Sequence, residues 1–437
     1  MFYLFEDIEN KKLNLLDKFF SLLFLLLPIA LISGPFLSDL ILSLIGIYFI
    51  FISFRDNLWN YYKNYFVYLF ICFYLFILFN SIISHDPFFS LKSSVFYFRY
   101  LFFVLGASYL LKINYKLINC FLFILIGLTV IIFFDSLLQF LYGKNIFGWN
   151  QFPSRVSGLF GDNLVMGRYF SHIMPIMFAL LLIQKKNNKK ILFIGIVLLS
   201  LISIITFLSG ERAAFINLCI ASFIILLLTS QFRKYSLYLF ILNIGIIFFL
   251  LISSSNLKDR FVSQSINQIN NESGQYLLSR EYEALFVTSF RMFKDKPILG
   301  HGPNLFRIKC ADPKYNVPKW GCSTHPHNTY LQLLSEIGLI GTFPILLSFF
   351  IVSYFYIRQL YIQWFTYKKS ILNDYQICLL ASITITIFPL TTSLNFFNNW
   401  ISILYYLPLC FLLINPSVNK ANKLMKNEAI FQKSSNF

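Results

Sequence analysis

The sequence predicts an all-α protein that crosses a membrane about twelve times and carries one large loop on the outer side. Three observations predict this fold class. Of 437 residues, 57% are hydrophobic and only 13% are charged, which is more apolar surface than a water-soluble domain could cover. The apolar residues form runs long enough to span about 30 Å of hydrocarbon. Basic residues cluster between alternate runs, as they do in cytoplasmic loops.

Twelve apolar runs fit the length of a membrane-spanning helix. They lie near residues 18–34, 37–53, 65–84, 94–111, 117–141, 164–183, 191–209, 212–230, 235–253, 337–357, 374–394 and 400–415. The first two are separated only by residues 33–35 (SGP), and the last two only by the uncharged stretch 395–399. These two divisions depend on the weakest breaks in the pattern.

The basic clusters predict the orientation of the chain. They lie at residues 11–18, 55–63, 112–116, 185–190, 233–234, 358–369 and 420–433. The positive-inside rule places them in the cytoplasm, so both termini lie inside and residues 254–326 lie on the far side. The net charge of +17 could suggest nucleic-acid binding, but the basic residues follow no single face, which disfavours that class. No small-residue cleavage site follows the first apolar run, so we expect that helix to be retained.

Four segments follow from this topology. Residues 1–253 hold about nine transmembrane helices, and residues 254–336 form the outer loop with the candidate motifs. Residues 337–415 hold about three further helices, and residues 416–437 form a cytoplasmic tail. No repeat with a period of 20 to 50 residues divides the chain, so we expect one membrane domain with one large insertion.

The outer loop contains a predicted amphipathic helix at residues 280–296, suited to lying along the outer membrane face. Ser279 can cap its first turn, and Pro297 and Gly300 end it. Its apolar face is formed by residues at helical spacing: Tyr282, Leu285, Phe286, Ser289, Phe290 and Phe293.

Two of the seven cysteines, Cys310 and Cys322, bracket a polar, proline-containing stretch of the outer loop, whereas the others lie in apolar runs. If this loop faces an oxidising compartment, a disulfide bond is the favoured interpretation. A metal site is disfavoured because no CxxC spacing supports it. No acidic pair of the kind that binds a divalent metal and no nucleotide-binding glycine loop is present, so we expect neither a metal nor a cofactor.

Arg212 begins the eighth run, at a helix N-terminus on the outer side. Unpaired backbone N–H groups and the helix dipole favour an anion there. An interfacial arginine that pairs with Glu211 is an equally open interpretation.

Further basic residues gather on the same side. Arg280 stands at the start of the amphipathic helix, and Arg291 falls within about 20° of it around that helix. A solvated loop arginine is the favoured interpretation of Arg291. Arg155 and Arg168 form a second polar cluster where the sixth run enters from outside, and both are candidate substrate contacts.

His325 and His327 are the only close histidine pair. His327 directly precedes Asn328 at the predicted start of a helix, and a neutral imidazole there can accept a proton from a hydroxyl group, which is general-base chemistry. His325 is a candidate substrate contact, although solvent exposure is a stronger alternative. Asn328, directly after His327, is a further candidate substrate contact.

Three motifs, LSGERAAF at 208–215, SREYEALFVTSFRMFKDKPILGHGPNLF at 279–306 and HNTYLQLLSEIGLIG at 327–341, give the chain a resemblance to a known family. It resembles the superfamily of O-antigen ligases and Wzy-type O-antigen polymerases, membrane glycosyltransferases of the GT-C type. These enzymes act on glycans linked to undecaprenyl diphosphate. The resemblance implies that Arg212 and Arg280 hold the donor diphosphate and that His327 activates the acceptor hydroxyl. The family usually has Ser where this chain has Glu211.

Two enzymatic functions follow from the resemblance. A ligase would transfer the finished glycan to a lipid A-core sugar, whereas a polymerase would use a second carrier-linked glycan as acceptor. Either would sit in the bacterial inner membrane with its active site in the periplasm. A small-anion transporter, the third hypothesis, is disfavoured because the ionisable residues gather at the outer boundary rather than at mid-membrane.

Overall fold

The computed structural model describes residues 13–184, 189–269, 279–366 and 370–414, and these residues form an all-α protein. The predicted fold class is confirmed. In the described residues the only β-type pairings are the isolated bridges Lys144–Asn150 and Phe152–Arg155. The predicted cytoplasmic tail, 416–437, lies outside the described residues.

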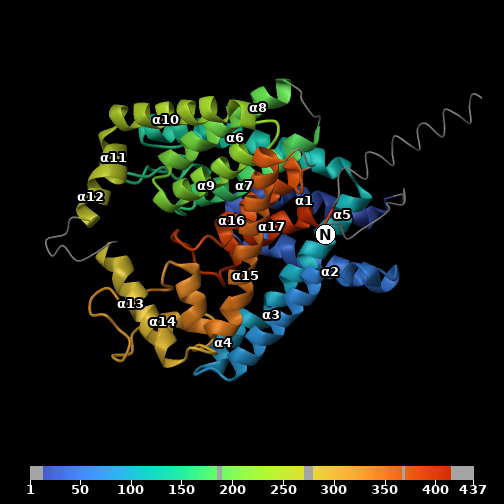
Figure 1. The fold of residues 1–437 in the computed structure, drawn as a ribbon, viewed down its shortest axis with the longest axis vertical. Coiled ribbons are helices and arrows are strands. Elements are labelled where there is room, and N and C mark those ends of the chain that lie inside the picture. The colour runs from blue at the N-terminus through green and yellow to red at the C-terminus, as the bar shows by residue number, and fades with distance from the viewer. Residues whose placement is uncertain (1–12, 185–188, 270–278, 367–369, 415–437) are drawn as a thin grey trace, which may run out of the picture.

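The helices follow one another along the described part of the chain (Figure 1). The first nine are α1 (Leu15–Ser33), α2 (Pro35–Arg55), α3 (Tyr65–Ile82), α4 (Pro87–Ser94), α5 (Arg99–Ile113), α6 (Lys116–Tyr142), α7 (Met166–Gln184), α8 (Lys189–Leu208) and α9 (Arg212–Leu228). They are followed by α10 (Ser236–Ser253), α11 (Ser255–Lys258), the π-helical turn η5 (Asp259–Ser263), α12 (Gln264–Ile269), α13 (Arg280–Asp295), α14 (Phe306–Lys309), α15 (Thr329–Phe365), α16 (Asp374–Thr386) and α17 (Asn399–Leu412).

All twelve predicted runs fall on helices, but the described helices are not all long enough to span a membrane. Eight are, where the continuous helical segment Pro87–Ile113, which contains α4 and α5, counts as one. The number is nine if the bent pair formed by residues 241–253 and 255–267 counts as a further span. Helices α9, α16 and α17 are shorter. The predicted run 374–394 was too long, because α16 ends at Thr386 and the loop 387–398 follows. This polar loop contributes to the candidate site.

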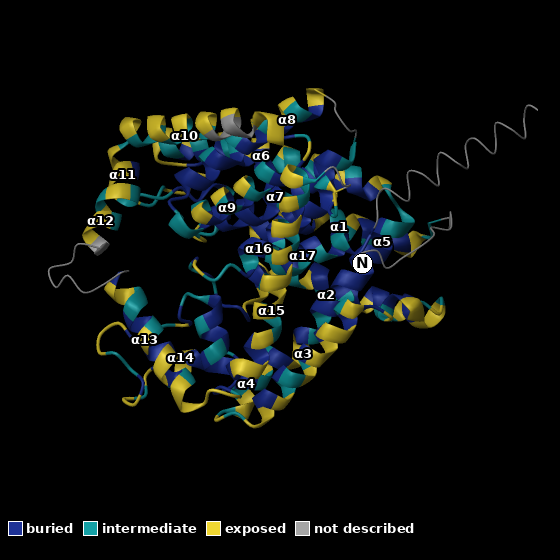
Figure 2. Cartoon of the chain, viewed as in Figure 1, coloured by how far each residue is buried: buried dark blue, intermediate teal, exposed yellow. Residues whose placement is uncertain are grey.

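Helix α7 forms the centre of the bundle. Every residue from Met166 to Leu182 is buried, and α7 packs against α8, α9 and α16. By contrast, exposed residues follow α3 (Figure 2), where Leu69, Leu75 and Phe79 are all more than half exposed. An apolar exterior around a packed interior fits a helix bundle whose solvent is lipid.

Several connections between helices that are far apart in the sequence contact one another. The turn at Gly34, the stretch before α7, the histidine segment and the loop 387–398 share one cavity. Elsewhere, Ser230 donates to Asp374 and Gln363 donates to the Leu228 carbonyl. The polar site belongs to the connections that share the cavity.

The chain after α10 turns sharply, by 111°, into the segment α11 to α12. In Figure 1 this segment descends from the end of α10, while α13 and α14 lie beside α15 in the lower half. The predicted amphipathic helix is α13, and Ser279 caps it by accepting a hydrogen bond from the Tyr282 amide.

The buried face of α13 differs from the predicted apolar stripe. It consists of Ala284, Leu285, Thr288, Ser289 and Met292. Phe290 is 46% exposed, whereas the Ser289 hydroxyl donates to the Leu331 carbonyl of α15 at 2.7 Å. The helix therefore buries a face of both small and apolar residues and leaves Phe290 exposed.

Candidate active site

The histidine pair is held by the loop 387–398. The rings of His325 and His327 lie with their centroids 4.1 Å apart. The Ser393 amide donates to the His327 carbonyl at 2.9 Å, while His325 Nε2 lies 3.2 Å from the Ser393 carbonyl. His327 has a positive φ of 55°, a conformation that costs an L-residue free energy and is found at sites where the surroundings enforce it.

The hydrogen bonds of His325 assign its protons. A carbonyl oxygen can only accept, so Nε2 of His325 carries the hydrogen that is donated to Ser393. Nδ1 then accepts from the Thr324 hydroxyl, 3.0 Å away. Both ring nitrogens of His325 are therefore occupied, and this histidine acts as a fixed wall against which His327 packs.

Both imidazoles favour the neutral state. Burial lowers the pKa of His325 to about 3. Burial is also the main cause that lowers the pKa of His327, opposed by its interaction with the Ser393 backbone. A neutral ring can accept a proton, so His327 has the protonation state that a general base requires.

Arg168 is the buried cation next to the histidine pair. It is 7% exposed and lies in the first turn of α7. Nη1 donates to the Thr392 carbonyl at 3.2 Å, one residue before Ser393, while Nε is buried without a hydrogen-bond partner. Its positive charge also lowers the pKa of His327.

Asn328 is the N-cap of α15. Its side-chain oxygen accepts from the amides of Tyr330 and Leu331, and Nδ2 donates to the Pro389 carbonyl at 2.8 Å. The side chain thus ties the start of the helix to the loop 387–398, which positions His327 directly before it.

Arg280 lies in the turn of α13 that contacts the histidine pair. It is exposed and is the first residue of that helix. Two residues on, the Tyr282 ring meets the His327 ring edge-on at 5.6 Å, and the Glu281 carboxylate raises the pKa of His327. The first turn of α13 and the histidine pair therefore form one site.

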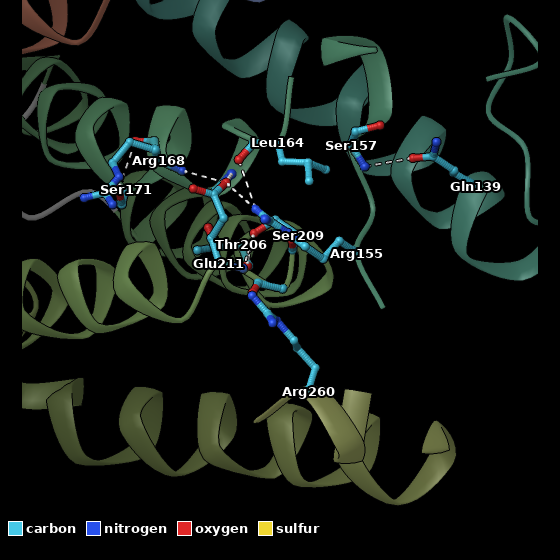
Figure 3. A network of polar contacts seen from close by, with 12 residues as sticks. Gln139, Arg155, Ser157, Leu164, Arg168, Ser171, Thr206, Ser209, Glu211 and Arg260 are labelled. Carbon is cyan, nitrogen blue, oxygen red and sulfur yellow. Dashed lines mark hydrogen bonds and ion pairs between the residues drawn. The ribbon is translucent and has the colours of Figure 1, made fainter. Parts of the chain in front are cut away.

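A second group of arginines surrounds the α8–α9 turn (Figure 3). Arg155 donates to the carbonyls of Ser209 and Leu164 at 3.1 and 3.0 Å. Arg260, which the sequence analysis did not single out, reaches from η5 to the Gly210 carbonyl at 3.2 Å. Gly210 has a φ of 65°, and an added Cβ would lie 2.8 Å from Arg155 Cγ, so a glycine is required here.

Arg212 lies at the first position of α9, where its Nη1 donates to the Ser265 hydroxyl of α12 at 2.9 Å. Arg260 is within electrostatic reach of Arg212, Arg155 and Tyr282. Tyr282 therefore lies between the arginines of the α8–α9 turn and the histidine pair. Through it, the structure brings the surroundings of Arg212 and His327 into one region.

Glu211 points toward the start of α7. Its carboxylate accepts from the Gly167 amide at 2.8 Å and lies 4.0 Å from Arg155 Nη2. A carboxylate at a helix N-terminus is favourable because it meets the helix dipole and unpaired N–H groups. Glu211 therefore caps the start of α7 and lies near Arg155. The sequence pattern alone did not indicate this structural role.

Arg291 lies at the other end of α13. Nη1 donates to the carbonyls of Tyr315 and Asn316, in the loop closed by the disulfide bond between Cys310 and Cys322. Tyr315 in turn donates to Asp295 at 2.6 Å. In this position Arg291 tethers the disulfide loop to α13.

A buried amide network, also missed from the sequence, connects α15 to both loops of the site. Gln332 Nε2 donates to Asn395 at 2.7 Å and to Glu336 at 3.0 Å, and Glu336 accepts from the Phe306 amide at 3.0 Å. Gln332 and Glu336 are completely buried. Their spacing of four residues in an apolar helix was the available signal, since it places both on one face.

Among the described residues, no group of three or more His, Cys, Asp or Glu side chains could hold a metal ion. The site instead combines several guanidinium groups with a neutral imidazole. Fixed cations can stabilise a charged leaving group, and the imidazole can take up a proton.

The fold and the site define a multi-pass helical membrane protein with a polar site built by connections between its helices. Residues 195–346 match the model of a protein family described as O-antigen ligase. The resemblance predicted from the motifs is thus confirmed over this part of the chain, which is less than half of its length.

One relative comes from Rickettsia conorii (strain Malish 7) and carries the name "putative polysaccharide ligase". It is 37% identical to this chain over 97 residues. The matched segment covers 20% of this chain and 23% of the relative.

Proposed function

We propose that the protein is an O-antigen ligase-like glycosyltransferase. It moves a glycan from an undecaprenyl-diphosphate carrier to a sugar of lipid A-core on the periplasmic face of the bacterial inner membrane. One observation carries the proposal. His327, a histidine whose lowered pKa favours the neutral ring, lies in the same region as arginines from three connections, the stretch before α7, the α8–α9 turn and the start of α13. The family match over residues 195–346 and the ligase name of the relative support the same reaction class.

In the proposed reaction, His327 accepts the proton of the acceptor hydroxyl while that oxygen attacks the anomeric carbon of the donor glycan. The new glycosidic C–O bond forms as the bond from the anomeric carbon to the carrier diphosphate breaks. Arg212 and Arg280 hold the departing diphosphate, whose negative charge grows during the step. Direct displacement inverts the anomeric carbon.

Arg168 is a further candidate substrate contact in the same region. Its buried, incompletely paired guanidinium lies next to Thr392 and the histidine pair, where it can contact a donor or acceptor oxygen. Its charge also lowers the pKa of His327, because a nearby cation disfavours the imidazolium form. This keeps the ring neutral until it accepts the proton of the acceptor hydroxyl.

A gene deletion tests the proposal through the surface polysaccharide. We expect the deletion strain to accumulate long carrier-linked glycan while lipid A-core stays uncapped, and wild-type protein to restore capping. Core capped with a single repeat would indicate a polymerase instead. A polysaccharide unchanged by the deletion would overturn both functions.

A further inference from the structure

A cavity of about 390 Å³ lies beside His325, and none of the residues that form the proposed diphosphate site lines it. Its walls come from the α1–α2 turn, the stretch before α7, helix α14, the loop 387–398 and the first turn of α17. The size is at the small end of ligand pockets, which suits roughly one or two sugar rings.

The lining has two chemically different parts. The apolar part includes Pro35, Phe160 and Trp400, and the polar part includes Asn163, Arg307 and Asn395. A sugar ring has both an apolar face and a rim of hydroxyl groups, so a wall of aromatic and amide side chains matches it.

Arg307 gives the cavity a positive charge. It is exposed, lies in α14, and forms no hydrogen bond or ion pair with the residues that the structure describes. No acidic side chain lines the cavity. The charge of Arg307 also contributes to lowering the pKa of His325. An anionic ligand would pair with this arginine.

The histidine pair lies between the cavity and Tyr282. His325 lines the cavity, whereas His327 contacts Tyr282 on the other side. The two rings are 4.1 Å apart. A sugar seated in the cavity would therefore lie one imidazole ring away from His327, and we place the diphosphate among the arginines.

We infer that this cavity binds the acceptor, a sugar that carries a carboxylate or phosphate group, and that Arg307 recognises this anionic group. The inference rests on the proposed function, since it assigns the second substrate of the same reaction. In this assignment Arg307 determines the specificity for the acceptor, and Arg307 does not contact the donor diphosphate.

Transfer kinetics with purified protein in nanodiscs test the assignment. The acceptors are native lipid A-core, the same material treated with phosphatase, and the same material with its carboxyl groups reduced. We expect Arg307→Ala to raise the acceptor KM at least about tenfold, as loss of a charge-assisted contact does, while the donor KM stays unchanged. Arg307→Lys should recover part of the loss.

The matched control is Lys309→Ala, which removes a cation of the same short helix that does not line the cavity. Wild-type protein should lose affinity for whichever treated acceptor lacks the recognised group, and Arg307→Ala should no longer distinguish it. An unchanged acceptor KM in Arg307→Ala, or an equal effect of Lys309→Ala, would overturn the inference.

A binding measurement separates this inference from the proposed function. Lipid A-core should bind to the His327→Ala protein and bind at least about tenfold more weakly when Arg307→Ala is added. If wild-type protein transfers no glycan but this difference in binding persists, the proposed reaction is wrong and the cavity assignment stands. If transfer occurs and the difference is absent, only the cavity assignment fails.

Discussion

Tyr282 meets His327 edge-on, with ring centroids 5.6 Å apart and ring planes at 79°. The two residues lie on either side of the disulfide loop in the sequence, one in α13 and one directly before α15. Their contact joins the first turn of α13, including Arg280, to the proposed base. The site is therefore assembled by docking α13 onto α15, and several consequences can be measured.

Replacing His327 with Ala should lower the transfer rate by roughly 10²- to 10⁴-fold, the usual contribution of a general base. The measurement is a transfer assay with purified protein, normalised to the amount of protein inserted in the membrane. His301→Ala is a matched control, because His301 is another buried imidazole, located between α13 and α14, and donates to the Met292 carbonyl. Normal activity in His327→Ala would remove the base assignment.

The pH dependence of transfer should reflect the lowered pKa of His327. The reaction needs the neutral ring, so the rate should fall as pH decreases through the folded-state pKa, which burial places below 6.5. Glu281→Gln removes a carboxylate that raises this pKa. We expect the acidic limb of the pH–rate profile to lie at lower pH in Glu281→Gln than in the wild-type protein. A shift of this limb to higher pH would contradict the assignment.

Arg212→Ala and Arg280→Ala should each reduce transfer by roughly 10²-fold or more, as loss of a group that stabilises developing charge does. Lysine at either position should retain part of the activity, because it keeps the charge but loses the planar fork. Lys294→Ala is the control on α13, where Lys294 lies over the exposed Phe290 ring. Equal effects of all three alanine variants would indicate a general loss of surface charge.

Sequence reasoning recovered the helix pattern because apolar runs of membrane length are a strong signal. It could not foresee that α16 stops at Thr386, since the residues that follow are uncharged and partly apolar. Ser393 therefore went unnoticed, although its backbone holds both His325 and His327. Backbone partners have no side-chain signature in a single sequence.

The arginines show the same limit. Arg212 and Arg280 stood out because each begins a helix, and because the motifs around them resemble a family. Arg260 lies in a segment whose 111° turn away from α10 brings it to Gly210, and no local pattern predicts that approach. Glu211 looked like a partner of its neighbour Arg212, yet its carboxylate turns to the start of α7.

Glu211 should matter for the fold around Arg155 and α7. Glu211→Ala leaves the buried Gly167 amide without its acceptor and Arg155 without its nearby carboxylate, at a cost of roughly 1–3 kcal/mol. Glu211→Gln keeps an acceptor oxygen and should lose less. Thermal unfolding in detergent measures both variants, and an Ala variant as stable as the Gln variant would contradict the capping role.

Gly338 should tolerate no side chain. Its φ is 64°, and an added Cβ would lie 2.2 Å from the Ile298 carbonyl oxygen, where the amides of Leu339 and Ile340 bond residues 297 and 298. Gly338→Ala should destabilise the protein by more than about 1 kcal/mol. Gly127→Ala is the matched control in α6, because a Cβ there meets open space. Equal unfolding temperatures would contradict the close approach.

The disulfide bond between Cys310 and Cys322 should stabilise the region that carries Arg291 and Tyr315. It closes a loop with a sequence separation of 12, and a loop of this length contributes roughly 3 kcal/mol through the unfolded chain. Replacing both cysteines with Ser should lower the unfolding temperature and expose the α13–α14 contact to proteolysis. Replacing Cys72 and Cys120, which are exposed and free, should not. In intact cells, a thiol reagent should label Cys310 and Cys322 only after reduction, and labelling without reductant would show that the bond does not form.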